Sequence, residues 1–231
     1  GYFSPVASPA GRATLAPMAA RKAPGTLVLL VRHGTTPTTG RVLPGRAPGL
    51  HLAEEGVRQA AQVAERLAGL DLDAVYTSPL ERAQETAAPT AAAAGRPAIE
   101  EPGLLECDTG EWTGEKLATL ARRKEWRELH TSPATFRFPG GESLAELEAR
   151  VVGVLDRLRT AHPSGVVACF SHADPIRMAL AFALGAPLET FSRVAVGTGS
   201  VSAIRLAPGS PPSVLVVNSA QGPLDNLRTE R

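Results

Sequence analysis

The chain has 231 residues, a formal net charge of +1 and two cysteines. A near-neutral charge gives no reason to expect nucleic acid or a membrane surface as a partner. Two cysteines are too few for a disulfide scaffold, and no apolar stretch is long enough to cross a bilayer. We therefore expect a cytoplasmic protein whose length is sufficient for a large hydrophobic core.

The first 25 residues differ in composition from the rest. They are rich in Pro, Ala, Ser and Gly and have no hydrophobic period, which predicts a disordered N-terminal extension in residues 1–25. They lack the apolar core of a secretory signal, and whether the first 17 belong to the native protein stays open because Met18 is a possible start. No linker interrupts residues 26–218, which we expect to form a single domain, and residues 219–231 read as a polar tail.

The first predicted element is a strand over residues 26–31, an unbroken apolar run typical of a strand buried on both faces. A loop rich in Thr, Pro and Gly follows to residue 49, and its length indicates a binding loop. Apolar residues at helical spacing then predict a helix over residues 54–70.

A short strand is predicted at residues 74–76, followed by a helix over residues 80–94 with Ser78 as its N-cap and Pro79 at its first position. Another short strand is expected at residues 97–99 and a helix over residues 115–129. Ser143 and Glu146 resemble a capping box that opens a helix to residue 161.

Residues 165–170 form a second fully apolar strand, and residues 173–184 a helix that Gly185 ends. Residues 200–206 and 213–218 predict a closing hairpin. Because strands alternate with helices, we expect an α/β three-layer sandwich with a mostly parallel central sheet flanked by helices.

Polar side chains follow the apolar segments at several places. Arg32 and His33 end the first strand, His172 follows the second apolar strand, Glu106 follows two leucines, and Arg82 lies early in a helix. Open α/β sheets bind ligands at the carboxyl ends of their strands. Each residue also has an ordinary explanation, such as a solvated arginine or a capping histidine, but two strands that both end in a histidine favour a site.

Five motifs contain these residues. In chain order they are Arg32-His33-Gly34-Thr35-Thr36, Thr77-Ser78-Pro79-Leu80-Glu81-Arg82-Ala83-Gln84-Glu85-Thr86, Leu105-Glu106 with Gly110-Glu111-Trp112-Thr113-Gly114, Gly140-Gly141-Glu142-Ser143, and Ser171-His172. Together they resemble the histidine phosphatase superfamily, which includes the cofactor-dependent phosphoglycerate mutases. The resemblance covers residues 26 to about 206 and implies a phosphoglycerate mutase-like fold.

The resemblance also implies roles for the catalytic residues. His33 would be the nucleophile that forms a phosphohistidine, for which its imidazole must be neutral. Arg32 and Arg82 would clamp the phosphate oxygens, and His172, if protonated, would add a third cation. Glu106 would protonate the leaving oxygen and then activate water; burial would raise its pKa and the cations would lower it, a balance that the sequence leaves open.

Substrate contacts are expected from Thr39, Gly45, Arg46 and the Ala173 amide at a helix N-terminus. The expected partner is a small phosphorylated substrate, with a homodimer as a further possibility, and the scheme requires no cofactor and no metal. Four arginines could recognise a second anionic group or form a solvated helix face: Arg122, Arg123, Arg127 and Arg137.

Some positions depart from the family pattern. Thr39 stands where Asn is frequent, and Ala173 stands where Gly commonly follows the second histidine. The Tyr and Lys of phosphoglycerate mutases correspond to Thr109 and Leu117, which favours a phosphatase over a mutase. Three alternatives remain: a phosphomutase, a non-catalytic phosphate-binding module, and a metal site of His33, His172 and Glu106. The Asp-Thr-Gly at Asp108 occurs once, which argues against an aspartic protease.

Overall fold

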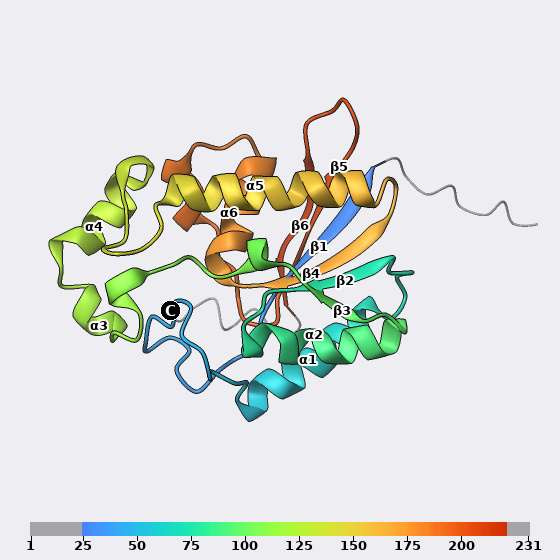
Figure 1. Cartoon of the computed structure of the whole chain (residues 1–231), viewed down its shortest axis with the longest axis horizontal. Helices are drawn as coiled ribbons and strands as arrows, with labels where there is room; N and C mark the ends of the chain where they lie inside the picture. The colour runs from blue at the N-terminus through green and yellow to red at the C-terminus, as the bar shows by residue number, and fades with distance from the viewer. Residues whose placement is uncertain (1–24, 221–231) are drawn as a thin grey trace, which may run out of the picture.

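A six-stranded sheet between two layers of helices forms the centre of the computed structural model, which describes residues 25–220 (Figure 1). Strands β3 (Ala98–Glu100), β2 (Ala74–Thr77), β4 (Val166–Ser171) and β1 (Thr26–Arg32) are adjacent in that order and parallel. Strands β5 (Val201–Leu206) and β6 (Ser213–Ser219) continue the sheet antiparallel. The predicted sandwich, its mostly parallel sheet and the closing hairpin are confirmed. The predicted N-terminal extension and most of the predicted tail lie outside the described residues.

Each face of the sheet is covered by its own pair of helices (Figure 1). Helices α1 (Glu54–Leu67) and α2 (Glu81–Ala94) lie on one side, and α5 (Leu144–Ala161) and α6 (Ala173–Ala183) lie on the other. The side chains of β1 alternate between two hydrophobic clusters: Val28 and Leu30 pack with the α5 and α6 side, whereas Leu29 and Val31 pack with the α1 and α2 side. Covering on both faces explains why the strand reads as an unbroken apolar run.

The predicted ends of the later helices are mostly correct. Ser143 Oγ accepts from the Glu146 N–H at 3.2 Å and the Glu146 carboxylate accepts from the Ser143 N–H at 3.0 Å, so the capping box is present. Helix α6 ends at Ala183, and Gly185 follows with φ 61°. That left-handed conformation is the reason for a glycine at this stop.

Two helix ends on the α1 and α2 side were predicted wrongly. Helix α2 begins at Glu81 with Leu80 as its N-cap, two residues after Ser78. The Ser78 hydroxyl accepts from the Leu80 N–H at 3.4 Å, ahead of the helix, and lies closer to His172 Nε2, at 2.7 Å. Helix α1 ends at Leu67, three residues early, where the Leu70 N–H bonds to the Leu67 carbonyl at 2.9 Å and turns the chain toward β2.

The helix predicted over residues 115–129 is two separate helices, α3 (Leu117–Leu120) and α4 (Lys124–Thr131). Between them, Arg123 has extended backbone and donates to both oxygens of Glu115 at 2.8 and 2.7 Å. Its guanidinium also lies 5.9 Å from the centre of the Trp112 ring. These contacts stabilise the extended residue that separates α3 from α4. Four short 3₁₀ helices complete the described elements: Pro102–Leu104, Gly110–Trp112, Pro133–Thr135 and Leu188–Arg193.

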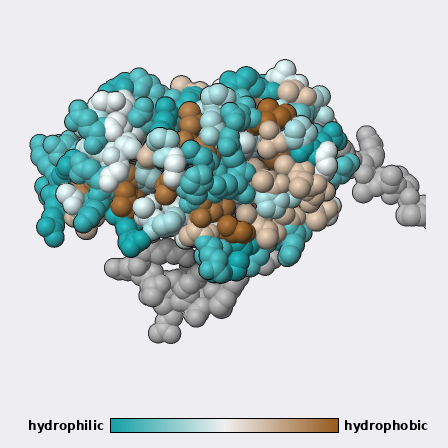
Figure 2. All heavy atoms as spheres, turned by 60° about the horizontal axis from the view of Figure 1, so that its bottom comes forward, coloured by the Kyte–Doolittle hydropathy of each residue, from teal (hydrophilic) through white to brown (hydrophobic). Residues whose placement is uncertain are grey.

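On the face shown in Figure 2, hydrophobic residues form separate patches among hydrophilic ones. Edge strand β6 carries Leu215, Val216 and Val217, which are exposed. Within residues 25–220, none of the helices combines the length and apolar character that a membrane span requires.

Candidate active site

The two histidines meet because of the register between β1 and β4. These parallel strands align Arg32 with Ser171, so the next residues, His33 and His172, leave the sheet side by side at its carboxyl edge. Their ring centres are 5.2 Å apart and the ring planes are inclined by 57°. Both side chains are buried.

Two arginines approach this pair from different elements. Arg32 is half-buried, and its Nη1 donates to the Val196 carbonyl at 2.7 Å. Arg82, on the first turn of α2, is fully buried, and its Nη2 donates to the Gly45 carbonyl at 2.8 Å. Within the described residues, Nε and Nη1 of Arg82 have no hydrogen-bond partner. A buried guanidinium with two free donors is suited to an anionic ligand.

A threonine of α2, Thr86, connects the Arg-His-Gly segment to Arg82. The Gly34 N–H donates to Thr86 Oγ1 at 3.0 Å, and this hydroxyl donates to the Arg82 carbonyl at 2.6 Å. A side chain at position 34 would place a Cβ 2.5 Å from the Gly56 carbonyl oxygen of α1, so only glycine fits there. Sequence reasoning assigned no role to Thr86, although its spacing of four residues from Arg82 is a helical one.

The His33 imidazole is in the form that a nucleophile needs. Its Nδ1 lies 2.7 Å from the Gly34 carbonyl oxygen, which can only accept, so Nδ1 carries the hydrogen and Nε2 is left with its lone pair. Burial lowers the pKa of His33 to about 3, and the charges of Arg32 and Arg82 act in the same direction. The expected neutral imidazole is thus consistent with the structure.

His172 is not in the protonated form that would make it a third cation. Burial lowers its pKa well below the ordinary value, and His33 and the nearby arginines lower it further. Its Nε2 lies 2.7 Å from Ser78 Oγ, and its Nδ1 has no hydrogen-bond partner among residues 25–220. In the free protein His172 is therefore neutral, and the role of Ser78 as its partner was missed because Ser78 was assigned to a helix cap.

The competing influences on Glu106 raise its pKa on balance. Burial raises the pKa of Glu106 to about 7, and the charge of Asp174 adds to the rise. The Cys107 N–H, which donates to Glu106 Oε1 at 2.9 Å, and the charges of Arg82 and Arg32 oppose it. A carboxyl with this pKa can both give and take a proton near neutral pH.

The four predicted substrate contacts lie at different parts of the site. Helix α6 begins at Ala173, as expected for an amide at a helix N-terminus. Gly45 has φ 49°, and a Cβ there would lie 2.3 Å from Thr109 Oγ1. The Thr39 hydroxyl accepts from the Thr36 N–H at 2.9 Å, within the loop itself.

The Arg46 guanidinium is bonded to other groups of the protein. Its Nε donates to the Glu106 carbonyl at 2.8 Å, its Nη2 donates to Glu142 at 3.2 Å, and its Nη1 lies 3.7 Å from Asp108. Two of the four other arginines considered for a second anionic group are also paired, Arg123 with Glu115 and Arg137 with Glu146. Arg122 and Arg127 are exposed.

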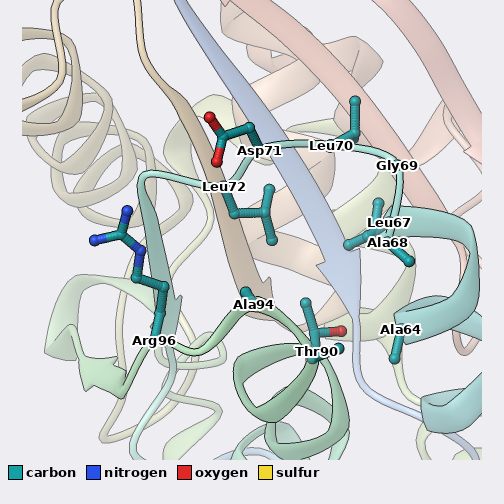
Figure 3. A pocket seen from close by; sticks show the side chains of 11 residues that line it. Ala64, Leu67, Ala68, Gly69, Leu70, Asp71, Leu72, Thr90, Ala94 and Arg96 are labelled. Atoms are coloured by element: carbon teal, nitrogen blue, oxygen red, sulfur yellow. The ribbon is translucent and has the colours of Figure 1, made fainter.

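A cavity of about 390 Å³ lies elsewhere, between the ends of α1 and α2 and the starts of β2 and β3 (Figure 3). Asp71 and Arg96 are its charged lining residues. This edge of the parallel strands is opposite the one that carries the histidines, so the cavity and the candidate active site are separate.

The alternative of a metal site finds no support in the described part of the chain. Residues 25–220 contain no group of three or more His, Cys, Asp or Glu side chains arranged to hold a metal ion. The site instead combines two neutral histidines, two arginines and a protonatable carboxyl. Such a set is suited to binding a phosphate group and moving a proton beside it.

The protein is an α/β sandwich whose site joins two histidines, two arginines and a carboxyl at the carboxyl edge of the sheet. The family model of the histidine phosphatase superfamily (branch 1) matches residues 28–219, and the chain belongs to this superfamily.

Several named proteins are similar to this chain. Phosphoserine phosphatase 1 of Hydrogenobacter thermophilus is 33% identical over 184 residues, which cover 78% of this chain and 86% of the relative. The protein named "Probable phosphoglycerate mutase GpmB" of Cronobacter sakazakii is 33% identical over 180 residues, which cover 77% of this chain and 83% of the relative. The crystal structure of the alpha-ribazole phosphatase of Shigella flexneri superposes with a TM-score of 0.73 at 26% identity, covering 84% of this chain and 96% of that one. These relatives are phosphatases or phosphomutases by name, which supports a catalytic role.

Proposed function

We propose that this protein is a phosphomonoester hydrolase that needs no metal ion and acts through a phosphohistidine at His33 on a small phosphorylated metabolite. The observation that carries the proposal is the state of His33, a neutral imidazole whose Nδ1 hydrogen is held by the Gly34 carbonyl and whose Nε2 lone pair is available. The arginines supply the positive charge that a phosphoryl transfer needs.

In the first step, Nε2 of His33 attacks phosphorus, and an N–P bond forms as the bond to the leaving oxygen breaks. Glu106 gives its proton to that oxygen. Arg32 and Arg82 hold the phosphate oxygens while negative charge shifts among them. A bound phosphate dianion would also raise the pKa of the neighbouring His172, so that it can become the third cation once substrate is present.

In the second step, the Glu106 carboxylate takes a proton from water, which attacks phosphorus. The N–P bond breaks, inorganic phosphate leaves, and both His33 and Glu106 return to their starting protonation states. A single carboxyl with a pKa near the working pH serves both steps.

The test is phosphate release from a panel of phosphate monoesters, with phosphoserine included because a relative is named for it. The assay contains EDTA throughout. We expect at least one metabolite of the panel to be hydrolysed at a rate that EDTA does not change. Loss of activity in EDTA that returns with an added divalent ion would contradict the metal-independent reaction.

A phosphomutase is the second candidate, favoured by the 33% identity to the protein named "Probable phosphoglycerate mutase GpmB". A mutase would return the phosphoryl group from His33 to the bound product instead of to water. Isomerised phosphoglycerate that appears faster than free phosphate would select this function.

The pKa of Glu106 predicts how the reaction depends on pH. Glu106 is protonated below about 7 and must give that proton in the first step, so kcat/KM should fall about tenfold per pH unit above about 7. His33, with a pKa of about 3, stays neutral across this range. The measurement is kcat/KM for phenyl phosphate from pH 4 to 10, in wild type and in Glu106→Gln.

The ionisation of the substrate affects both proteins equally and therefore cancels in the ratio of their profiles. Glu106→Gln should lack the fall above pH 7. If the variant shows the same fall as wild type, another group provides the proton.

A further inference from the structure

An ion network lies directly against the backbone of Glu106. It consists of three side chains from separate segments: Arg46 of the long loop, Glu142 just before α5, and Arg150 of α5. We call these three residues the Glu106 brace. Glu142 and Arg150 are largely buried, with 11% and 19% of their side chains exposed, and Arg46 is partly buried, with 31% exposed.

Arg150 forms the base of the brace. Its Nε and Nη2 each donate to one oxygen of Glu142 at 2.9 Å, a two-pronged ion pair. The same guanidinium donates through Nη1 to the carbonyls of Gly103 and Leu105, at 2.7 and 2.9 Å, and through Nη2 to the Glu106 carbonyl at 3.4 Å. One side chain thereby fixes the backbone on the N-terminal side of the Glu106 carboxyl.

Arg46 and Glu142 fix the other side. Arg46 Nε donates to the Glu106 carbonyl at 2.8 Å and its Nη2 donates to Glu142 at 3.2 Å. Glu142 also accepts from the Asp108 N–H at 3.2 Å. The backbone is therefore held both before and after Glu106, while the Glu106 carboxyl itself accepts from the neighbouring Cys107 N–H.

The brace also connects with the phosphate clamp. Gly45, the residue before Arg46, accepts from Arg82 Nη2 at 2.8 Å. A two-residue stretch of the loop thus contacts both the proposed clamp and the backbone of the proposed proton donor. A shift of this stretch would move Glu106 relative to Arg82.

Glu142 is ionised in this network. Burial acts to raise the pKa of Glu142, but the hydrogen bond and charge of Arg150, with further contributions from Asp108 N–H and Arg46, lower it on balance. Buried ion pairs contribute little net stability compared with apolar residues of similar volume. A buried ion network is therefore better explained by the geometry that it imposes on its neighbours.

We propose that Glu142, Arg150 and Arg46 are positioning residues that hold Glu106 at the distance from the clamped phosphate at which it can protonate the leaving oxygen. This inference rests on the proposed phosphatase function. The brace then affects proton donation by Glu106 and does not affect phosphate binding. Consequently, weakening the brace should slow only those substrates whose leaving group needs a proton.

The experiment compares wild type with Glu142→Gln, using phenyl phosphate and 4-nitrophenyl phosphate. Phenolate is a poor leaving group, with a conjugate acid of pKa about 10, as for tyrosine, whereas 4-nitrophenolate leaves with little need of a proton. We expect kcat/KM to fall about 10- to 100-fold for phenyl phosphate and less than about threefold for 4-nitrophenyl phosphate. The inhibition constant of inorganic phosphate should stay within about twofold of wild type because the clamp is intact.

Glu146→Gln is the matched control. Glu146 is an exposed glutamate in the same helix as Arg150, it pairs with Arg137 outside that helix, and glutamine also serves in a capping box. It should leave both substrates unchanged. Arg150→Lys is the second brace variant: it keeps the charge but cannot reach both Glu142 oxygens and the carbonyls together, and it should show the same selective loss.

Equal losses on the two substrates, or no loss on either, would overturn the positioning role. If both brace variants fail to fold, as judged by circular dichroism and thermal melting, the network is purely structural and the proposal is also wrong. Failure of the proposed function is distinguishable from these results, since wild type would then hydrolyse neither substrate.

Discussion

Replacing His33 by alanine is expected to reduce phosphate release by about 10⁴- to 10⁶-fold, the loss typical of removing a covalent nucleophile. The reason is that no other side chain in the described part of the site combines the position of His33 with its chemistry. His172 lies 5.2 Å away ring to ring, but its Nε2 is bonded to Ser78. The measurement is hydrolysis of 4-nitrophenyl phosphate in EDTA at pH 6, where both histidines are neutral in the free protein.

His130→Ala provides the matched control, because His130 is exposed on α4. It should retain the wild-type rate. A His33→Ala protein that is folded and keeps more than about a tenth of the wild-type rate would show that the nucleophile is another residue.

Replacing Arg82 by methionine is expected to reduce activity by about 10³-fold and, at the same time, to make the free protein more stable. Arg82 is fully buried, burial lowers its pKa, and its Nε and Nη1 have no hydrogen-bond partner within the described residues. Such a charge costs free energy until an anion arrives. A methionine of similar length fills the space without this cost.

We expect the free energy of unfolding to rise by about 1 kcal/mol, which corresponds to an increase in Tm of about 2–4 °C for a domain of this size. The gain in stability is smaller than the full cost of burying the charge, because the Gly45 carbonyl loses the hydrogen bond that Arg82 donates to it. Thermal melting with and without inorganic phosphate measures the effect. Phosphate at about 100 times its Kd should stabilise wild type by about 2.7 kcal/mol and the variant much less.

An exposed arginine of α1 gives the control for this experiment. Arg58 pairs with Glu54 and Glu55 at the surface, so Arg58→Met should keep both the activity and the response to phosphate. If Arg82→Met has a lower Tm than wild type in the absence of phosphate, the buried Arg82 does not destabilise the free protein and this explanation is wrong.

The central part of the fold was predictable because its signals are local or nearly so. The apolar runs of β1 and β4 indicate strands covered on both faces, and both strands end at the residue directly before a histidine. Once β1 and β4 pair in parallel with aligned ends, His33 and His172 lie side by side. The capping box at Ser143 is likewise complete within four residues.

The errors arose where distant residues decide a local structure. Ser78 precedes Pro79 and looks like a helix cap, but its hydroxyl bonds to His172, 94 positions further along the chain. The apolar spacing after residue 115 predicts a continuous helix, whereas the pair of Arg123 with Glu115 and the ring of Trp112 break it.

The role of Arg46 was likewise hidden, since its partner Glu142 is 96 positions away. From the sequence alone, an arginine in a loop beside a phosphate site is predicted to contact the substrate. Only the fold reveals that its guanidinium is occupied by Glu142 and the Glu106 carbonyl. The predicted substrate contacts of Thr39, Gly45 and Arg46 stay predictions, and in the free protein Arg46 and Thr39 are bonded to protein groups.

The measurement that tests the central claim most directly is capture of the phosphorylated enzyme. Wild type is mixed with radiolabelled phenyl phosphate, quenched in alkali, where phosphohistidine survives, and digested for mass spectrometry. We predict a phosphoryl group on His33 that forms and decays at rates consistent with turnover, and none in His33→Ala. Label on another residue, or phosphate release with no labelled protein at any quench time, would contradict the account.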